Sequence, residues 1–197
     1  MYSIRYYVAL LVLVALPPGI VLWYFIHPFA KFWRRLGPVW TYVFLSPVVI
    51  GLMVAAFLLR KPLLAVEFGT SIPLIVVAAI CIYTAVVIQR KRRQYLTNAI
   101  LTGIQELSRD NEPGTLLTEG IYGRIRHPRY VEFLLFVVAY ALFANFLASY
   151  VATLLSIPAL YMVVILEERE LRQRFGRRYD EYCATVPRCV PKRRVGA

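Results

Sequence analysis

Five long apolar runs alternate with short polar and basic segments along this 197-residue chain. The runs cover residues 4–26, 39–59, 68–88, 130–146 and 148–166. Because an α-helix needs about 20 apolar residues to cross a bilayer, each run predicts one transmembrane helix. Only a few residues around Asn145 separate the last two runs, which forces them into an antiparallel helical hairpin. The pattern therefore predicts an all-α integral membrane protein with about five transmembrane helices and a short helical tail after the hairpin.

Prolines interrupt two of these runs. Pro17 and Pro18 lie in the middle of the first run, and Pro158 lies within the last. A proline removes a backbone donor inside a helix, so we expect a kink or a break in the first span and a kink in the last.

The composition supports a membrane protein. Hydrophobic residues make up 59% of the chain and charged residues 17%, whereas soluble domains have about 45–50% apolar and about 25% charged residues. We expect a single membrane domain over residues 1–197. Residues 1–89 would form a three-span scaffold, and residues 90–197 the catalytic part, made of a cytoplasmic linker, the hairpin and the tail.

The net charge of +12 is better explained by membrane orientation than by nucleic acid binding, because the basic residues lie beside apolar runs. The segments after the first, third and fifth runs hold 3, 8 and 9 Lys or Arg, which is 20 of the 23 in the chain. Such an excess marks the cytoplasmic side. The count predicts an N-terminus outside the cell, a cytoplasmic C-terminus and no nucleic acid partner.

The segment GIYGRIRHPRY, residues 120–130, lies directly before the fourth run. Pro128 is tolerated in a first helical turn, which places Arg126 and His127 at a helix N-terminus. Free N–H groups and the positive end of the helix dipole favour an anionic group there. We therefore favour a functional role for Arg126, His127 and Tyr130, and interpret Arg124 and Arg129 as interfacial anchors.

A second polar segment, EERELRQRFGRRYDEY, follows the fifth run at residues 167–182. Glu168 has Arg172 at position i+4, and the pair is typical of a solvated helix face. Glu167 has Leu171 there instead, so we favour Glu167 as the functional carboxylate, with a partner such as Arg126 across the hairpin. The cytoplasmic ends of the two hairpin arms should bring these segments together.

Other kinds of site lack support in the sequence. The three cysteines form no CxxC pair, and only two histidines occur, so we predict no metal site. A glycine-rich nucleotide loop and a nucleophile elbow are also absent.

The ordered motifs GIYGRIRHPRY, EERELRQRFGRRYDEY and VPRCVPK resemble the isoprenylcysteine carboxyl methyltransferase family, part of a wider group that includes phospholipid N-methyltransferases. The resemblance covers residues 117–192. It implies S-adenosylmethionine as cofactor. The partners it implies are a lipophilic small molecule or a lipidated substrate, together with membrane lipids. Glu132 is a departure, because relatives often have a small residue at this position.

The resemblance also implies the residues of the site. Arg126, Glu167 and Tyr130 would be catalytic. The cofactor would contact Tyr122, Arg126, His127, Pro128, Tyr130, Glu167, Glu168 and Tyr182.

The favoured function is carboxyl O-methylation of an isoprenylcysteine-like or other acidic, lipid-like acceptor. Three alternatives stay open at this point. They are N-methylation of a phospholipid or lipid amine, an NADPH-dependent membrane reductase, and a non-catalytic membrane scaffold or transport subunit. An amine acceptor must lose a proton, so Glu167 would then matter as a base or cation partner.

Overall fold

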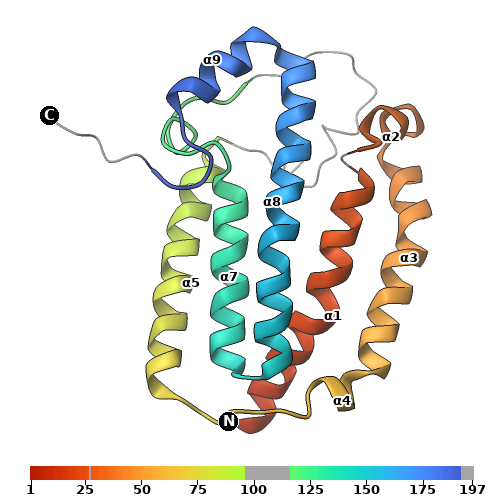
Figure 1. Cartoon of the computed structure of the whole chain (residues 1–197), viewed down its shortest axis with the longest axis vertical. Helices are drawn as coiled ribbons and strands as arrows, with labels where there is room; N and C mark the ends of the chain where they lie inside the picture. Colours follow the sequence, from red (N-terminus) through yellow and green to blue (C-terminus); the bar gives the residue numbers. More distant parts are fainter. Residues whose placement is uncertain (27, 96–115, 192–197) are drawn as a thin grey trace, which may run out of the picture.

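The computed structural model describes residues 1–26, 28–95 and 116–191. The helices in this part of the chain are α1 (Tyr2–Ile26), α2 (Ala30–Leu36), α3 (Pro38–Leu58), α4 (Arg60–Leu63), α5 (Ile72–Arg93), α7 (Pro128–Ala144), α8 (Leu147–Phe175) and α9 (Arg177–Thr185). The long helices α1, α3, α5, α7 and α8 run roughly alongside one another (Figure 1). The predicted all-α fold is confirmed.

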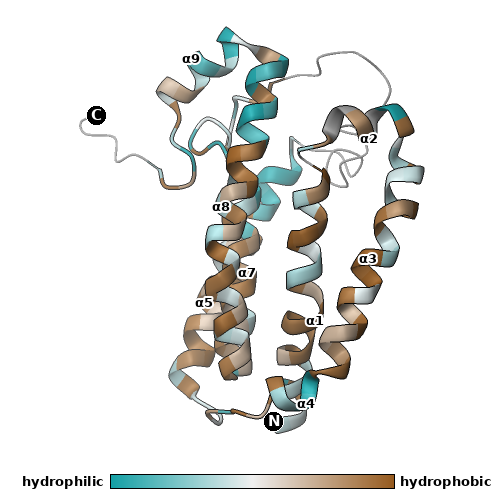
Figure 2. Ribbon diagram, turned by 45° about the vertical axis from the view of Figure 1, so that its right-hand side comes forward, coloured by the Kyte–Doolittle hydropathy of each residue, from teal (hydrophilic) through white to brown (hydrophobic). Residues whose placement is uncertain are grey.

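The bundle is organised around α1, which packs against α3, α7 and α8. Its buried side chains Val12, Leu16 and Ile20 form a core with Val137 of α7 and Leu160 of α8. By contrast, α3 buries only Thr41 and Leu45. Apolar residues dominate the shafts of the long helices, whereas hydrophilic residues gather at the end that carries α9 (Figure 2). Apolar helix surface that stays exposed in this way is suited to contact lipid.

The helix pair α5–α7 packs closely. Ala78, Ala85 and Arg92 are the buried residues of α5, spaced seven residues apart. In α7, Ala139 is buried seven residues after Glu132, which pairs with Arg92. Small residues let two helix backbones approach each other without a large apolar core, as is common between helices in membranes.

Four of the described helices, α1, α3, α5 and α8, are long and apolar enough to cross a membrane. The helix α7 has 17 residues, slightly fewer than a span ordinarily needs, although it lies within the bundle beside α5 and α8 (Figure 1). Of the five runs predicted to span the membrane, the fourth therefore gives the shortest of the long helices.

Several helix boundaries differ from the prediction. The helix α1 continues through Pro17 and Pro18 without a break. In α5 the helix includes the basic residues 90–93 instead of ending before them. The last long helix, α8, extends to Phe175 and therefore carries the polar residues 167–175 rigidly beyond the apolar shaft. At about 1.5 Å per residue, its 29 residues span about 43 Å. The sequence also predicts a short interfacial helix at residues 94–107 and a turn at residues 109–114, and these two segments lie mostly outside the described residues.

The connection between α7 and α8 is built around Asn145, as the sequence predicted. Asn145 adopts a left-handed conformation with φ 57°, which asparagine tolerates better than most residues. Its side-chain amide donates to the carbonyl of Gly69, and its side-chain oxygen accepts from the hydroxyl of Tyr150. An isolated antiparallel bridge joins Glu67 to Phe146. The connection between α5 and the preceding helices is thus tied to this turn.

Arg5 stabilises the same end of the bundle, although its side chain is almost completely buried. Its Nη1 atom lies 2.7 Å from Glu67 Oε1 and donates to the hydroxyl of Thr70, while Nε donates to the carbonyl of Ala144. A buried arginine needs such partners, because burial of an unpaired charge costs several kcal/mol. Arg5 therefore links α1, the residue 64–71 segment and the end of α7.

Candidate functional site

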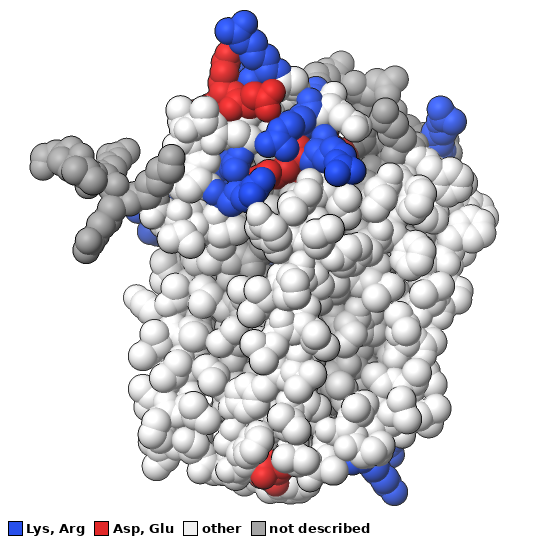
Figure 3. Space-filling model, viewed as in Figure 1, with Lys and Arg blue, Asp and Glu red and all other residues white. Residues whose placement is uncertain are grey.

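Charged residues lie mainly at one end of the bundle. In Figure 3 they cover the end formed by α8 and α9, and a broad uncharged belt separates them from a few charged residues at the opposite end. The helix α7 begins at the first of these ends, where His127 precedes Pro128. The two polar segments singled out in the sequence meet there.

Glu168 is the centre of the site. Its side chain is completely buried. Arg126 Nη2 and His127 Nε2, from the N-terminus of α7, each lie 3.2 Å from Glu168 Oε1. Arg188, from the C-terminal segment, donates two hydrogen bonds to Glu168: from Nη2 to Oε2 at 2.9 Å and from Nε to Oε1 at 3.0 Å. Arg172 Nη2, one helical turn further along α8, is 3.8 Å away.

The backbone of the C-terminal segment reinforces this cluster. The N–H groups of Arg126 and His127 donate to the carbonyls of Pro187 and Arg188 at 2.9 and 3.0 Å. The guanidinium of Arg188 also donates to the hydroxyl of Tyr161 on α8. The start of α7, the end of α8 and residues 186–189 therefore form one hydrogen-bonded unit.

The expected role of Glu168 on a solvated helix face was wrong. Leu160, Val164 and Glu168 are all buried, and their spacing of four residues puts them on one face of α8. That face points at the start of α7, so Glu168 meets Arg126 and His127, and Arg172 is left at the rim. Arg126 forms an ion pair with Glu168, whereas the sequence analysis named Arg126 as an example of a partner for Glu167.

Glu167 lies beside this network and is partly accessible. Its side chain is 25% exposed, and its Oε2 atom is 3.6 Å from His127 Nδ1. The imidazole of His127 is thus placed between two carboxylates. Burial lowers the pKa of His127, but the two neighbouring carboxylates of Glu167 and Glu168 have the larger combined effect, so the pKa is raised above its usual value. His127 therefore keeps its positive charge to a higher pH than a free histidine.

The charges of the cluster leave an excess of positive charge. Arg126, Arg188 and protonated His127 face Glu167 and Glu168. The buried Nε of Arg126 has no hydrogen-bond acceptor within the described part of the chain. An available guanidinium donor next to a helix N-terminus suits a carboxylate or another anionic group.

The tyrosines of the predicted site have different environments. The hydroxyl of Tyr182 donates to the carbonyl of Tyr122 at 2.6 Å, and Tyr182 packs with Tyr179 and Val186 in a small core below α9. Burial raises the pKa of Tyr122 to about 12. The ring of Tyr130 lies 5.9 Å from the ring of His127 and packs on the α1–α8 core.

Glu132 is not part of the Glu168 cluster but forms a separate buried ion pair with Arg92. Both of its carboxylate oxygens accept from Arg92 of α5, at 2.8 and 3.1 Å, and Gln89 donates to Oε1 at 3.2 Å. This pair crosses the α5–α7 contact. It accounts for a carboxylate at a position where a small residue was expected.

Sequence reasoning missed Arg188 and Arg92. Arg188 lies within the VPRCVPK motif, and its position between two valine–proline pairs was the available signal. Arg92 follows Ala78 and Ala85 at intervals of seven residues, which marks it as the residue of the basic run that faces α7.

An all-helical bundle with long apolar shafts is typical of an integral membrane protein, and the buried charge cluster at one end of it is the candidate site. The model of the phospholipid methyltransferase family matches residues 73–178, and the chain belongs to this family. The match includes α7, its preceding motif and all of α8.

Two curated relatives are similar to a part of the chain. A protein-S-isoprenylcysteine O-methyltransferase of Schizosaccharomyces pombe is 32% identical over 85 residues, which are 43% of this chain and 36% of that protein. Protein-S-isoprenylcysteine O-methyltransferase B of Arabidopsis thaliana is 37% identical over 84 residues, or 42% of this chain and 43% of that protein. No solved structure gives a significant match. The family resemblance read from the motifs is confirmed.

The geometry predicts that Glu168 matters more for stability than Glu167. Glu168→Gln removes the negative charge shared by Arg126, His127 and Arg188, and loss of one partner from a buried ion pair typically costs about 3–5 kcal/mol. Glu167→Gln changes a partly exposed group and should cost less. Thermal unfolding of the purified protein in detergent measures both. Equal unfolding midpoints for the two variants would contradict the central position of Glu168.

The raised pKa of His127 predicts a pH-dependent stability. The unfolded histidine titrates near pH 6.5, and the folded pKa lies above this value. The stabilisation is therefore fully present below about pH 6.5 and is lost as the pH rises through the folded pKa. The gap in unfolding midpoint between the wild type and His127→Gln should narrow from pH 6 to pH 9. A gap that stays constant over this range would exclude a protonated His127.

Proposed function

We propose that this protein is an S-adenosylmethionine-dependent methyltransferase that methylates the carboxylate of a lipophilic acceptor at the membrane surface. The acceptor is isoprenylcysteine-like or another acidic lipid-like molecule. One observation carries the proposal: at the start of α7, the cations Arg126, His127 and Arg188 surround two carboxylates of α8. The chain that holds this cluster belongs to a methyltransferase family. The names of both relatives support the same class of acceptor.

The residues present fit the cofactor. S-adenosylmethionine carries a carboxylate, an ammonium group and ribose hydroxyls. The available Nε donor of Arg126 suits the carboxylate, and the partly exposed Glu167 suits an ammonium or hydroxyl group. The rest of the proposed cofactor site consists of the other residues that the family resemblance implies: Tyr122, His127, Pro128, Tyr130, Glu168 and Tyr182.

When bound, S-adenosylmethionine would supply a methyl group on a cationic sulfur, which a carboxylate oxygen accepts without proton transfer as the sulfur–carbon bond breaks and its electron pair stays on sulfur. The protein's task is therefore orientation and exclusion of water more than acid–base chemistry. Glu168 acts as a positioning residue, since it fixes Arg126 and His127. Arg126, Glu167 and Tyr130 are the proposed groups nearest the reacting atoms.

A second candidate is N-methylation of a lipid amine. The description of the matching family, phospholipid methyltransferase, favours it, and Glu167 would accept the proton that an amine must lose. The charge of the acceptor site separates the two candidates, because a carboxylate acceptor is anionic and a protonated amine is cationic.

Arg126→Ala tests the cofactor assignment. Loss of one charged hydrogen bond in a buried site costs about 1.5–3 kcal/mol, which corresponds to a roughly ten- to 150-fold weaker affinity. Binding of labelled S-adenosylmethionine to the purified protein measures this change. Arg177→Ala is the matched control, because Arg177 is exposed on α9 and contacts Glu181. Unchanged donor affinity in folded Arg126→Ala would refute the assignment.

We also propose that the end with the Glu168 cluster faces the cytoplasm and the N-terminus faces outward, as the positive-inside rule suggests. In a variant with Cys81, Cys183 and Cys189 replaced by serine, a membrane-impermeant maleimide added to intact cells should label Lys61→Cys. Arg178→Cys should react only after permeabilisation. The reverse pattern would invert the proposed orientation.

A further inference from the structure

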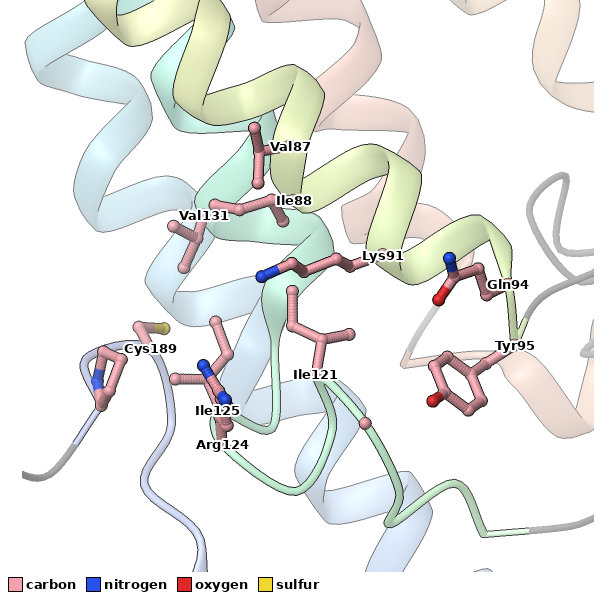
Figure 4. Close-up of a pocket in the computed structure, with 12 residues that line it drawn as sticks. Val87, Ile88, Lys91, Gln94, Tyr95, Ile121, Arg124, Ile125, Val131 and Cys189 are labelled. Carbon is pink, nitrogen blue, oxygen red and sulfur yellow. The ribbon is translucent and has the colours of Figure 1, made fainter. Parts of the chain in front are cut away.

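A pocket of about 420 Å³ lies beside the charge cluster and contains none of the proposed cofactor residues. Its apolar wall comes from two helices and the loop before α7, and consists of Val87, Ile88, Ile121, Ile125 and Val131. These side chains face one another in Figure 4. A volume of this size suits the head and the first part of the chain of an amphiphile.

Two cations complete the pocket. Lys91 extends from α5 into it, and Arg124 lies beside Ile125 (Figure 4). Among the described residues that line the pocket, none is acidic. The cations therefore favour an anionic head and disfavour a protonated amine.

The pocket lies where the hydrocarbon layer should end. Val87 and Ile88 belong to the last apolar turn of α5, and Lys91 belongs to the basic run that follows. Apolar groups toward the lipid and cations toward the water match the two ends of an acidic amphiphile.

The pocket also shares a wall with the proposed methyl-transfer site. Three of its lining residues are chain neighbours of that site: Ile125 precedes Arg126, Val131 follows Tyr130, and Cys189 follows Arg188. The same short segments thus contact the pocket and the Glu168 cluster. An anionic head in the pocket would need only a short path to reach the groups at the start of α7.

We propose that this pocket is the acceptor site and that Lys91 and Arg124 select a carboxylate-bearing amphiphile over an amine. The inference rests on the proposed methyltransferase function and specifies its substrate class. It favours O-methylation over N-methylation, because the two cations attract the ionised nucleophile and repel an ammonium group.

A binding experiment tests the site independently of methyl transfer. Fluorophore-labelled palmitate is titrated into the full chain in non-ionic detergent, with palmitate, hexadecanol and hexadecylamine as competitors. Palmitate should compete best and hexadecylamine worst. The double variant Lys91→Gln/Arg124→Gln should weaken palmitate binding about tenfold, the sum expected for two partly exposed ion pairs.

The matched control is Arg90→Gln/Arg93→Gln. It removes the same amount of charge, in this case entirely from the helix that carries Lys91, but neither residue lines the pocket, so palmitate affinity should stay unchanged. Val87→Trp places a larger side chain in the apolar part of the pocket. It should also weaken palmitate binding, while labelled S-adenosylmethionine still binds. Equal palmitate affinity in the wild type and Lys91→Gln/Arg124→Gln, or hexadecylamine competing as well as palmitate, would overturn the proposal.

A kinetic experiment separates failure of the pocket from failure of the function. With an S-farnesylcysteine derivative as acceptor, Lys91→Gln/Arg124→Gln should raise the acceptor KM about tenfold and leave kcat and donor affinity close to the wild type. An unchanged KM overturns the acceptor site while the methyltransferase stands. Absence of donor binding and of methyl transfer in the wild type refutes the function, and the palmitate titration then still decides whether the pocket selects anions.

Discussion

The burial of Glu168 among cations is the interaction on which the proposed site depends. A carboxylate that is fully removed from water costs several kcal/mol unless charged donors surround it. Arg126, His127 and Arg188 provide these donors from two other parts of the chain. The cost of leaving Glu168 unpaired therefore holds the start of α7 and the C-terminal segment against α8. A local ion network thereby sets the arrangement of three segments that the sequence separates by up to about 60 residues.

The opposite end of the bundle uses the same principle. Arg5 is buried with Glu67, Thr70 and a backbone carbonyl at the end of α7, and Glu132 and Arg92 join α5 to α7 nearer the site. Apolar side chains alone give little preference for one helix arrangement over another in lipid, because the surrounding chains are equally apolar. Paired buried charges have few alternative partners, so they help to determine which helices lie together.

The sequence predicted the features that depend on local pattern. The apolar runs predicted the long helices, and Asn145 predicted the turn between the last two, because hydrophobicity and backbone preference act within a few residues. The role of Glu168 was not predictable in this way. Its i+4 neighbour Arg172 suggested a solvated pair, whereas its burial depends on Arg126 and Arg188, whose positions are set by tertiary packing. Glu132 was recognised as unusual, but only the packing of α5 against α7 identified Arg92 as its partner.

The placement of charge at this end of the bundle has a chemical consequence. In the proposed reaction, a cationic methyl donor and an anionic acceptor would attract each other, and both would lose their charge when the methyl group moves. A site that excludes water strengthens this attraction, because electrostatic interactions are larger at low dielectric constant. The protein must then keep the acceptor's carboxylate ionised close to lipid, which is costly without nearby cations. Lys91 and Arg124 at the pocket, next to Arg126 and His127, offer that compensation where a lipid-soluble acceptor leaves the bilayer.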